Sequence, residues 1–229
     1  MNPAAGGKVR MAKTKPRLLD LFCCAGGAGM GYHRAGFEVV GVDIKPQPRY
    51  PFEFVQADAL EYLTSLIDSG EIEKFDVIHA SPPCQAYSVM RAKFPEREYP
   101  DLYIPTRDIL SRLNKPWVIE NVIGSPPGPS IILCGHSFGL GTYRHRRFES
   151  NVCLLAMAHS PHSIKSVRQG YGAYSGEMMS VTGDLNSQRF FDAAKRAMGI
   201  DWMERKELSQ AIPPAYTEFI GKQLMEVLQ

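Results

Sequence analysis

A glycine cluster placed directly after a short apolar segment is the feature that most restricts how this chain can fold. Residues 17–22 are mostly apolar and lead into the segment CCAGGAGMG, in which Gly27, Gly29 and Gly31 occupy every second position. Glycines let a ligand approach the backbone closely, and the first turn of a following helix offers unpaired N–H groups. The segment predicts a strand, a ligand-binding turn and a helix, and a plain tight turn in an α/β protein is the alternative.

Two absent motifs and two carboxylates indicate which kind of ligand the glycine cluster binds. The spacing is not G-x-G-x-x-G, which argues against a dinucleotide oxidoreductase, and no GK[ST] follows, which excludes a P-loop. Asp43 closes the next predicted strand, where it is placed to accept hydrogen bonds from ribose hydroxyls, and Asp58 could take an adenine amino group. Either residue alone is more often a turn residue, but the ordered set indicates an adenosine ligand without a pyrophosphate. S-adenosylmethionine fits this description.

Predicted strands and helices alternate along the first half of the chain. Apolar runs indicate strands at residues 17–22, 38–43, 54–58, 75–80 and 117–120, and helical spacing is found at 59–67, 106–113, 191–205 and 216–228. This alternation is typical of an α/β fold with a parallel sheet. Residues 150–190 have weak periodicity and predict an irregular insert.

Composition excludes several classes of protein. The chain has 229 residues, of which 44% are hydrophobic and 22% are charged, so a wholly disordered or fibrous protein is excluded. No apolar run approaches about 18 residues, and the first residues lack the apolar segment of a secretory signal. A soluble, cytoplasmic protein is therefore expected. The net charge of +2 decides little about nucleic-acid binding, which depends on local basic surfaces.

The five cysteines show neither a metal-binding nor a disulfide pattern. No two of them have C-x-x-C spacing, and an odd number argues against a disulfide framework. His159 and His162 have no Cys/His set around them in the sequence, so we interpret them as loop histidines and expect no metal. Cys84 is different, because it follows a predicted strand and two prolines that fix the backbone. Open α/β sheets bind ligands at such positions, although a lone cysteine is more often a buried hydrophobic residue.

Two further groups are candidate partners of Cys84. Glu120 ends the apolar run WVIE and is a candidate proton donor. The basic segment 144–147 carries guanidinium groups that can bind carbonyl oxygens or phosphates. Taken alone, Glu120 could be a capping or salt-bridged carboxylate, and the arginines could be a solvated charge run. Together and in sheet order, the three groups indicate a catalytic site.

From Leu19 onward the chain resembles the cytosine-5 DNA methyltransferases, in the compact form of phage and small prokaryotic members. DLFCCAGGAGMGYHRAG, GVD and QAD resemble the first three family motifs, SPPCQAYS the catalytic motif and ENV the proton-donor motif. TYRHR and AIPPAYTEFIG resemble later motifs, in the same order. The family usually has Gly-Phe where Ser81-Pro82 stands and Gly where Cys24 stands.

The resemblance implies a fold, a domain organisation and a cofactor. The expected fold is α/β, the Rossmann-like fold of S-adenosylmethionine-dependent methyltransferases, with a small irregular target-recognition insert. The implied parts are a basic flexible tail at 1–16, a cofactor-binding and catalytic core at 17–148, a minimal target-recognition region at 149–191 and C-terminal helices completing the core at 192–229. Residues implied in binding S-adenosyl-L-methionine are Asp20, Phe22, Gly26, Gly27, Gly29, Asp43, Ile44, Asp58, Ala59 and Pro82.

The implied enzyme transfers a methyl group to carbon 5 of a flipped-out cytosine in double-stranded DNA. Cys84 would add to carbon 6, Glu120 would hydrogen-bond or protonate ring nitrogen 3, and Arg146 would hold the base carbonyl. Asn121 would order the pocket, and Gln85 completes the implied catalytic set. The implied DNA contacts are Ser88, Arg91, Lys93, Arg97, Arg144, Arg168, Gln188 and Arg189.

The predicted target-recognition region is short for the family. Because each good contact reads one base edge, a recognition sequence of about two to four base pairs is expected. We expect a monomer, with no protein partner and no membrane. Three alternatives remain: an RNA (tRNA) cytosine-5 methyltransferase, transfer of a modified methyl group from a variant donor, and a catalytically silent DNA-binding relative.

Overall fold

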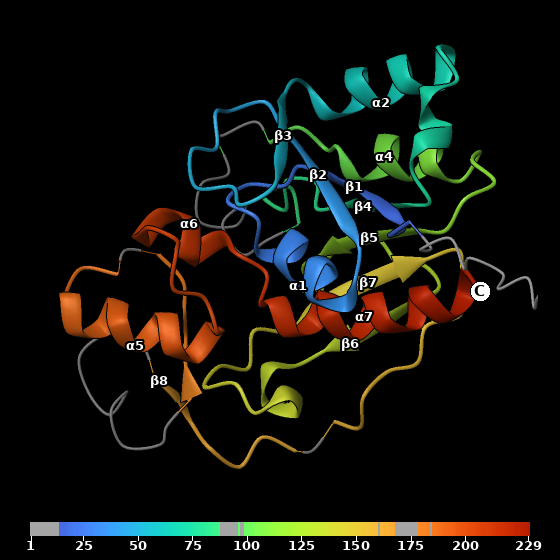
Figure 1. Cartoon of the computed structure of the whole chain (residues 1–229). Helices are drawn as coiled ribbons and strands as arrows, with labels where there is room; N and C mark the ends of the chain where they lie inside the picture. The colour runs from blue at the N-terminus through green and yellow to red at the C-terminus, as the bar shows by residue number, and fades with distance from the viewer. Residues whose placement is uncertain (1–13, 88–95, 97–98, 160, 168–177, 184) are drawn as a thin grey trace, which may run out of the picture.

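A seven-stranded mixed sheet lies at the centre of the protein (Figure 1). The computed structural model describes residues 14–87, 96, 99–159, 161–167, 178–183 and 185–229. Across the sheet the strands follow the order β3-β2-β1-β4-β5-β7-β6. Their bounds are β1 Arg17–Leu21, β2 Glu38–Asp43, β3 Glu53–Gln56, β4 Val77–Ala80, β5 Trp117–Asn121, β6 Ser130–Leu133 and β7 Arg146–Ser150.

The sheet is parallel except at β7. β1 to β5 pair in parallel, whereas β7 runs antiparallel to β5 on one side and to β6 on the other. The prediction of a parallel sheet is therefore confirmed for the first five strands and wrong for β7. β6 and β7 were also not predicted as strands, because they have four and five residues and β7 reads RRFES, with no apolar run.

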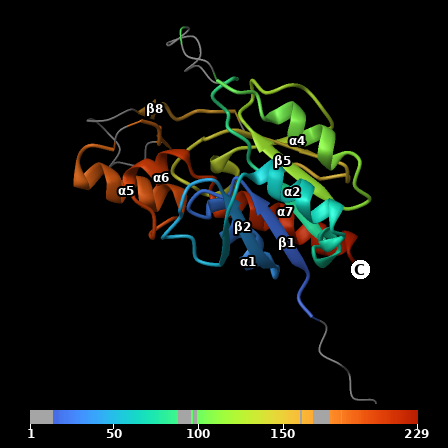
Figure 2. The ribbon, with the colours of Figure 1, turned by 90° about the horizontal axis from the view of Figure 1, so that it is seen from above.

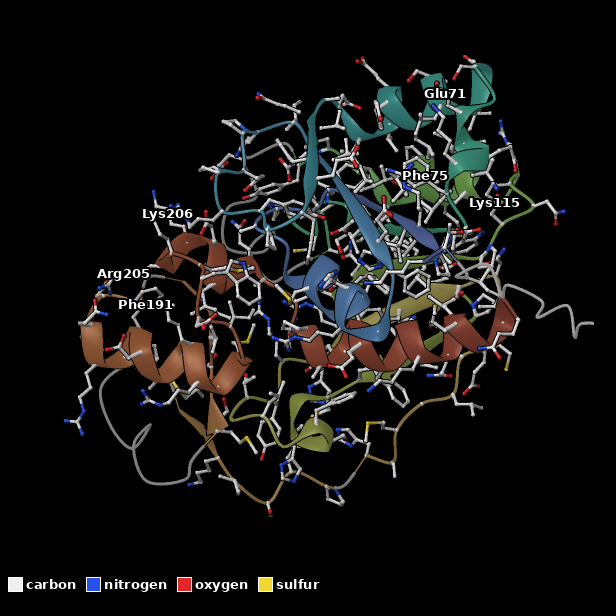
Figure 3. All side chains as sticks on the ribbon, in the orientation of Figure 1. Glu71, Phe75, Lys115, Phe191, Arg205 and Lys206 are labelled. Carbon is white, nitrogen blue, oxygen red and sulfur yellow. The ribbon has the colours of Figure 1, made fainter. Side chains whose placement is uncertain are left out.

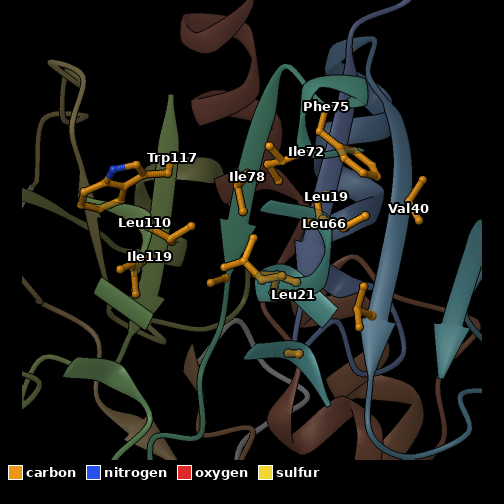
Figure 4. Packing of buried hydrophobic residues seen from close by; sticks show 14 of the residues in the cluster. Leu19, Leu21, Val40, Leu66, Ile72, Phe75, Ile78, Leu110, Trp117 and Ile119 are labelled. Atoms are coloured by element: carbon orange, nitrogen blue, oxygen red, sulfur yellow. The ribbon is translucent and has the colours of Figure 1, made fainter. Parts of the chain in front are cut away.

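Successive residues of the central strands face opposite sides of the sheet, and both sides are covered. Leu19 and Leu21 belong to one buried cluster, while Leu18 between Arg17 and Leu19 belongs to another. The helices α2 Ala59–Asp68 and α4 Tyr103–Leu110 contribute to the first cluster, part of which is drawn in Figure 4. The helices α1 Gly27–Ala35 and α7 Pro214–Val227 contribute to the second. Strands buried on both faces are apolar almost throughout, which explains why they were recognised from sequence.

The helices α5 Gln188–Met198 and α6 Arg205–Gln210 lie together at the end of the molecule opposite the C-terminus (Figures 1 and 2). Helical structure was predicted over 191–205; the prediction is confirmed for 191–198 and wrong for 199–204. Gly199 adopts a left-handed conformation with φ 66° and ends α5, and a capping box between Glu204 and Glu207 begins α6. Trp202 Nε1 donates to the carbonyl of Ala25 at 2.9 Å, so this region packs against the glycine cluster.

The remaining elements are short. They are the 3-10 turns η1 Glu71–Lys74 and η2 Gly135–Phe138 and a two-stranded parallel sheet of β8 Ser166–Val167 and β9 Met178–Met179. Among the described residues, no helix has both the length and the apolar character needed to cross a membrane.

Two glycines of the cluster are required by helix packing. A Cβ atom on Gly31 would lie 2.1 Å from the Oγ1 atom of Thr217, and one on Gly27 would lie 2.5 Å from the carbonyl oxygen of Ile212. Thr217 Oγ1 also donates to the carbonyl of Ala28 at 2.8 Å. The glycine cluster therefore lets α1 and α7 approach each other closely, a role that ligand binding alone did not predict.

Candidate active site

A cavity of about 440 Å³ opens at the carboxyl ends of β1, β2, β4 and β5. Most of the predicted cofactor and catalytic residues line it, namely Asp20, Phe22, Gly27, Asp43, Ile44, Asp58, Ala59, Pro82, Cys84, Gln85, Glu120 and Arg146. The other predicted residues of these two groups, Gly26, Gly29 and Asn121, are not among the lining residues. The structure thus brings the two predicted sites into one cavity.

Gly26 and Gly29 do not line the cavity but pack against residues near it, Gly26 against Tyr50 and Gly29 against Tyr50 and Asp20. Gly26 is the N-cap of α1 and has φ 82°, a left-handed conformation that glycine adopts without strain. A Cβ atom on Gly29 would lie 2.9 Å from Oδ2 of Asp20 and 3.0 Å from the hydroxyl of Tyr50. Both glycines therefore permit the close packing that holds Asp20 in place.

Asp20 is fully buried, and one of its two carboxylate oxygens has no hydrogen-bond partner among the described residues. Its Oδ2 atom accepts a hydrogen bond from the Tyr50 hydroxyl at 3.2 Å, whereas Oδ1 has no partner within the described part of the chain. Burial raises the pKa of Asp20 to about 7, and the nearby Asp43 charge adds to the shift. An unpaired buried carboxylate oxygen in a cavity wall is suited to a cationic ligand, and S-adenosylmethionine carries a sulfonium and an ammonium group.

Asp43 holds the loop after β1 against the end of β2. Its Oδ2 atom accepts from the backbone N–H of Cys24 at 3.0 Å, and its Oδ1 atom accepts from Lys45 N–H at 2.9 Å. Phe22 and Cys24 have positive φ values of 57° and 44°, which are uncommon for residues other than glycine. Such strained backbone occurs at ligand-binding sites, where surrounding contacts maintain it.

Asp58 has a structural role that the sequence analysis missed. Its Oδ1 atom accepts from the backbone N–H groups of Leu60 and Glu61, so Asp58 caps the N-terminus of α2. The signal was present, because an aspartate directly before a helical run is a common N-cap. Asp58 also lines the cavity, which leaves its predicted contact with adenine as a proposal.

Cys84, Glu120 and Arg146 line the cavity together. Arg146 Nε lies 3.0 Å from Oε1 of Glu120, and the Glu120 side chain is only 6% exposed. Burial raises the pKa of Glu120, while Arg146 and a hydrogen bond from Ser81 oppose that shift. Burial and the negative charge of Glu120 raise the pKa of the Cys84 thiol, and Arg146 opposes the rise. The negative charge of Glu120 therefore disfavours the thiolate form of Cys84, and the positive charge of Arg146 favours it.

A chain of buried hydrogen bonds extends from Glu120 into the core. The Tyr32 hydroxyl lies 2.9 Å from His79 Nδ1, and His79 Nε2 lies 2.9 Å from the Ser81 hydroxyl, which is bonded to Glu120. Burial lowers the pKa of His79 to about 3, so the imidazole is neutral. Because the single hydroxyl proton of Ser81 goes to the carboxylate, Ser81 accepts from His79 Nε2–H, and His79 Nδ1 accepts from Tyr32. Sequence reasoning missed Ser81 and His79 as site residues, although Ser81 was noted as a departure from the family pattern.

Asn121 and Arg144 position other residues. Asn121 Nδ2 donates to the carbonyl of Pro82 at 2.9 Å and so holds the loop before Cys84 against β5. The guanidinium of Arg144 donates at 2.6–2.8 Å to three carbonyl oxygens, those of Val181, Ser209 and Ala211. The prediction that Arg144 contacts DNA does not fit this arrangement, because its guanidinium is bonded inside the protein.

Most of the other predicted DNA contacts, Ser88, Arg91, Lys93, Arg97 and Arg168, lie outside the described residues. Gln188 and Arg189 are exposed at the start of α5. Gln188 Oε1 accepts from Arg205 at 2.7 Å, and Gln188 Nε2 donates to Asp192 at 2.8 Å. Arg205 also stacks on Phe191, with its guanidinium carbon 4.8 Å from the ring centroid, and lies beside Lys206 in Figure 3. Exposed basic side chains are thus present at this end of the molecule.

The Rossmann-like α/β fold of this protein is similar to the fold of solved methyltransferases. The structure of the Dnmt2 methyltransferase of S. pombe superposes with a TM-score of 0.59 and 13% sequence identity. The superposition covers 94% of this chain and 100% of that chain.

Sequence comparison matches part of the chain to one family. Residues 16–124 match the family described as C-5 cytosine-specific DNA methylase. The type II methyltransferase M.AgeI of Thalassovita gelatinovora is 27% identical over 124 residues, which cover 47% of this chain and 28% of the relative. M1.HphI of Haemophilus parahaemolyticus is 36% identical over 80 residues, which cover 31% of this chain and 22% of the relative. The chain spans less than a third of the length of either relative.

Proposed function

We propose that this protein transfers the methyl group of S-adenosyl-L-methionine to carbon 5 of a flipped-out cytosine in double-stranded DNA. The observation that carries the proposal is the shared cavity, which Cys84, Glu120 and Arg146 line together with Asp20 and Asp43. The family match supports the same chemistry. A base inside a stacked duplex cannot reach such a cavity, so the target must leave the stack.

Cys84 is the nucleophile in this proposal. Its thiolate adds to carbon 6 of cytosine, which gives carbon 5 the electron density that it needs to attack a methyl group. The bound donor supplies that methyl group on its sulfonium. Loss of the carbon 5 proton to a base then restores the double bond between carbons 5 and 6 and expels the Cys84 thiolate.

Glu120 and Arg146 stabilise the charge that develops on the ring. A raised pKa suits Glu120 to hydrogen-bond or protonate ring nitrogen 3, and Arg146 is placed beside it to bind the carbonyl oxygen of the base. Protonation of Glu120 also removes the negative charge that raises the pKa of Cys84. Binding of the base to Glu120 would therefore favour the thiolate at the step that requires it.

Asp20 and Asp43 bind the two ends of the cofactor in this proposal. The unpaired Oδ1 atom of Asp20 suits the cationic methionine portion, and Asp43 at the end of β2 suits the ribose hydroxyls. The ring of Phe22 lines the same cavity and would stack on the adenine. Asp58 would receive the adenine amino group.

DNA binding is assigned to the loop after Cys84 and to the region 149–191. Ser88, Arg91, Lys93, Arg97 and Arg168 would contact DNA, with Gln188 and Arg189 at the start of α5. We propose a short recognition sequence and a monomeric enzyme. Recognition by Gln188 would require it to exchange its present bonds to Asp192 and Arg205 for bonds to the DNA.

The proposal is tested by nucleoside mass spectrometry of duplex DNA of mixed sequence after incubation with the protein and S-adenosylmethionine. Wild-type protein should convert cytosine to 5-methylcytosine, Cys84→Ser should not, and Cys153→Ser, which alters an exposed cysteine outside the cavity, should behave as wild type. Parallel incubations with tRNA identify an RNA substrate, and the mass of the product base identifies a modified methyl group. DNA binding without a product on either nucleic acid would contradict the proposal and favour a silent relative.

A further inference from the structure

Four potential metal ligands converge outside the cavity, at the sheet edge formed by β6 and β7. The Sγ atom of Cys134 and one imidazole nitrogen from each of His145, His159 and His162 all lie within 4.8 Å of one another. None of these residues lines the catalytic cavity. The interpretation of His159 and His162 as ordinary loop histidines missed the cluster, because His145 stands 14 positions before His159 and Cys134 stands 28 positions before His162.

The distances within this Cys–His cluster match tetrahedral metal coordination. His159 Nε2 lies 3.1 Å from His145 Nε2 and 3.1 Å from His162 Nε2, and Cys134 Sγ lies 3.6 Å from His162 Nε2. Zn–N bonds of about 2.0–2.1 Å and a Zn–S bond of about 2.3 Å at tetrahedral angles separate two nitrogens by about 3.3 Å and nitrogen from sulfur by about 3.6 Å. These three distances are close to those of one N₃S coordination sphere, and the other pairs of ligand atoms lie within 4.8 Å.

Hydrogen bonds alone do not explain the arrangement. An imidazole nitrogen carries either one in-plane proton or one in-plane lone pair. His159 Nε2 therefore cannot form two well-directed hydrogen bonds, one to His145 and one to His162, at 3.1 Å each. A cation between the rings is bound by all three nitrogen lone pairs at once, and the buried Cys134 supplies a fourth ligand.

We propose that Cys134, His145, His159 and His162 bind one structural Zn²⁺ ion. Zn²⁺ combines imidazole and thiolate ligands in tetrahedral geometry. Four protein ligands close the coordination sphere, as in structural zinc sites, whereas catalytic sites keep one position open for water or substrate. The ring of Tyr143 stacks on His162, with centroids 3.6 Å apart and planes inclined by 14°, and so fixes the direction of that ligand.

The ion would anchor the start of the proposed target-recognition region to the sheet. Cys134 follows β6 and His145 precedes β7, whereas His159 and His162 belong to the coil between β7 and β8. Most residues of 151–159 are exposed, so burial of apolar side chains contributes little to the order of this coil. Small regions without a sufficient core are commonly stabilised by a metal ion.

Direct hydrogen bonds also hold the same coil, including two between Leu155 and the side chain of Gln223. The Ser137 hydroxyl donates to the carbonyl of Ala158 at 3.0 Å, and the Tyr143 hydroxyl donates to the carbonyl of Ile164 at 2.6 Å. Each of these bonds fixes one point of the chain. The zinc ion would fix two side chains of the coil to two of the core, and it makes the region dependent on metal supply.

The first test is the metal content of the full chain, purified without a histidine tag and without chelators, by inductively coupled plasma mass spectrometry. Wild-type protein should carry one zinc per chain, and Cys134→Ser and His159→Gln should lose it. Cys153→Ser and His33→Gln are the matched controls, because they alter an exposed cysteine and an exposed histidine outside the cluster, and both should keep the ion. Zinc kept by both cluster variants would overturn the proposal.

The second test uses wild-type protein, so it remains decisive if the variants fail to fold. Protein freed of metal with a chelator is titrated with Co²⁺, which has visible absorption bands when tetrahedral and a charge-transfer band when a thiolate is bound. We expect saturation at one equivalent with both signatures, and a higher melting temperature after addition of Zn²⁺. No saturable binding, or binding without the thiolate band, would overturn the proposal. Neither test depends on methyl transfer.

Discussion

Arg146 Nε and Glu120 Oε1 lie 3.0 Å apart, although the two residues belong to strands that run in opposite directions. Glu120 on β5 is opposite Phe148 on β7, so Arg146, two residues from Phe148, lies diagonally across on the same face. The side chains are 17% and 6% exposed, so solvent and salt screen this pair less than a surface pair. The protonation states of Glu120 and Cys84 are therefore coupled, and this coupling can be measured.

We expect Glu120→Gln to make Cys84 more reactive at a lower pH. The negative charge of Glu120 raises the pKa of the thiol, so its removal lowers that pKa and shifts the pH dependence of thiolate formation downward. The measurement is the rate of Cys84 alkylation by iodoacetamide against pH, followed by peptide mass spectrometry. Cys153 in the same digest is the internal control. An unchanged midpoint for Cys84 would show that Glu120 does not act on the thiol.

Cofactor binding should release protons through Asp20. Its pKa of about 7 in the free protein should fall when a cationic ligand pairs with the carboxylate, so protons leave on binding and affinity rises with pH up to about 7. Calorimetry in buffers of different ionisation enthalpy measures the number released near pH 6. Asp20→Asn should abolish the release, and a buffer-independent enthalpy for wild-type protein would contradict the assignment.

Asp20 should also give stability a pH dependence of its own. Its folded pKa lies above the ordinary value of 3.8, so the folded protein binds more protons than the unfolded chain between about pH 4 and 7. The free energy of unfolding should therefore fall as pH rises through this range, and Asp20→Asn should lessen the slope. Urea unfolding at a series of pH values checks this, with Asp68→Asn as an exposed control. Equal slopes in the wild type and Asp20→Asn would rule out the effect.

Ser81→Ala should destabilise the protein by about 1–3 kcal/mol, because it leaves the buried His79 Nε2–H without an acceptor and removes a donor to Glu120. The loss of that donor should also raise the pKa of Glu120, which moves the pH dependence of methyl transfer upward. Urea unfolding and a pH–rate profile measure the two effects. Ser65→Ala, at an exposed serine of α2, should change stability by less than about 0.5 kcal/mol. A Ser81 variant as stable as wild type would exclude the hydrogen-bond chain.

Gly31→Ala should lower the free energy of unfolding by about 1–3 kcal/mol or more, because the added methyl group overlaps Thr217 and the backbone of Pro214. Thermal and urea unfolding measure the loss. Adding Thr217→Ala should not restore stability, since the backbone oxygen of Pro214 would still lie 2.2 Å from the new Cβ atom. Arg34→Ala, at an exposed position of the same helix, is the control, and an equal effect of both variants would contradict the packing argument.

The sequence predicted best those residues that follow apolar strands. Asp43 and Glu120 lie at the ends of such runs, and Cys84 follows one after a serine and two prolines. Parallel strands bring their carboxyl ends to one edge of the sheet. Arg146 was assigned by resemblance, because β7 has no apolar pattern of its own. Its position beside Glu120 results from antiparallel pairing with β5, which a single sequence does not reveal.

Contacts between distant segments could not be predicted in the same way. The bonds of His79 to Tyr32 and Ser81 depend on a buried histidine whose partners come from a helix and a loop. The carbonyl oxygens that bind Arg144 come from Val181, Ser209 and Ala211, and carbonyl groups leave no mark on the sequence. Side-chain chemistry was therefore easier to predict than the backbone geometry that holds it.

The packing of Thr217 against Gly31 also has a consequence for biosynthesis. Helix α1 beside the cavity is translated early, but it finds its packing surface only in α7, which is translated much later. A nascent chain on the ribosome therefore cannot complete the packing of α1 until α7 has left the exit tunnel. Newly made protein would therefore gain the ability to bind a ligand in this cavity in a single late step. A chain on a ribosome stalled within α7 would not yet have that ability.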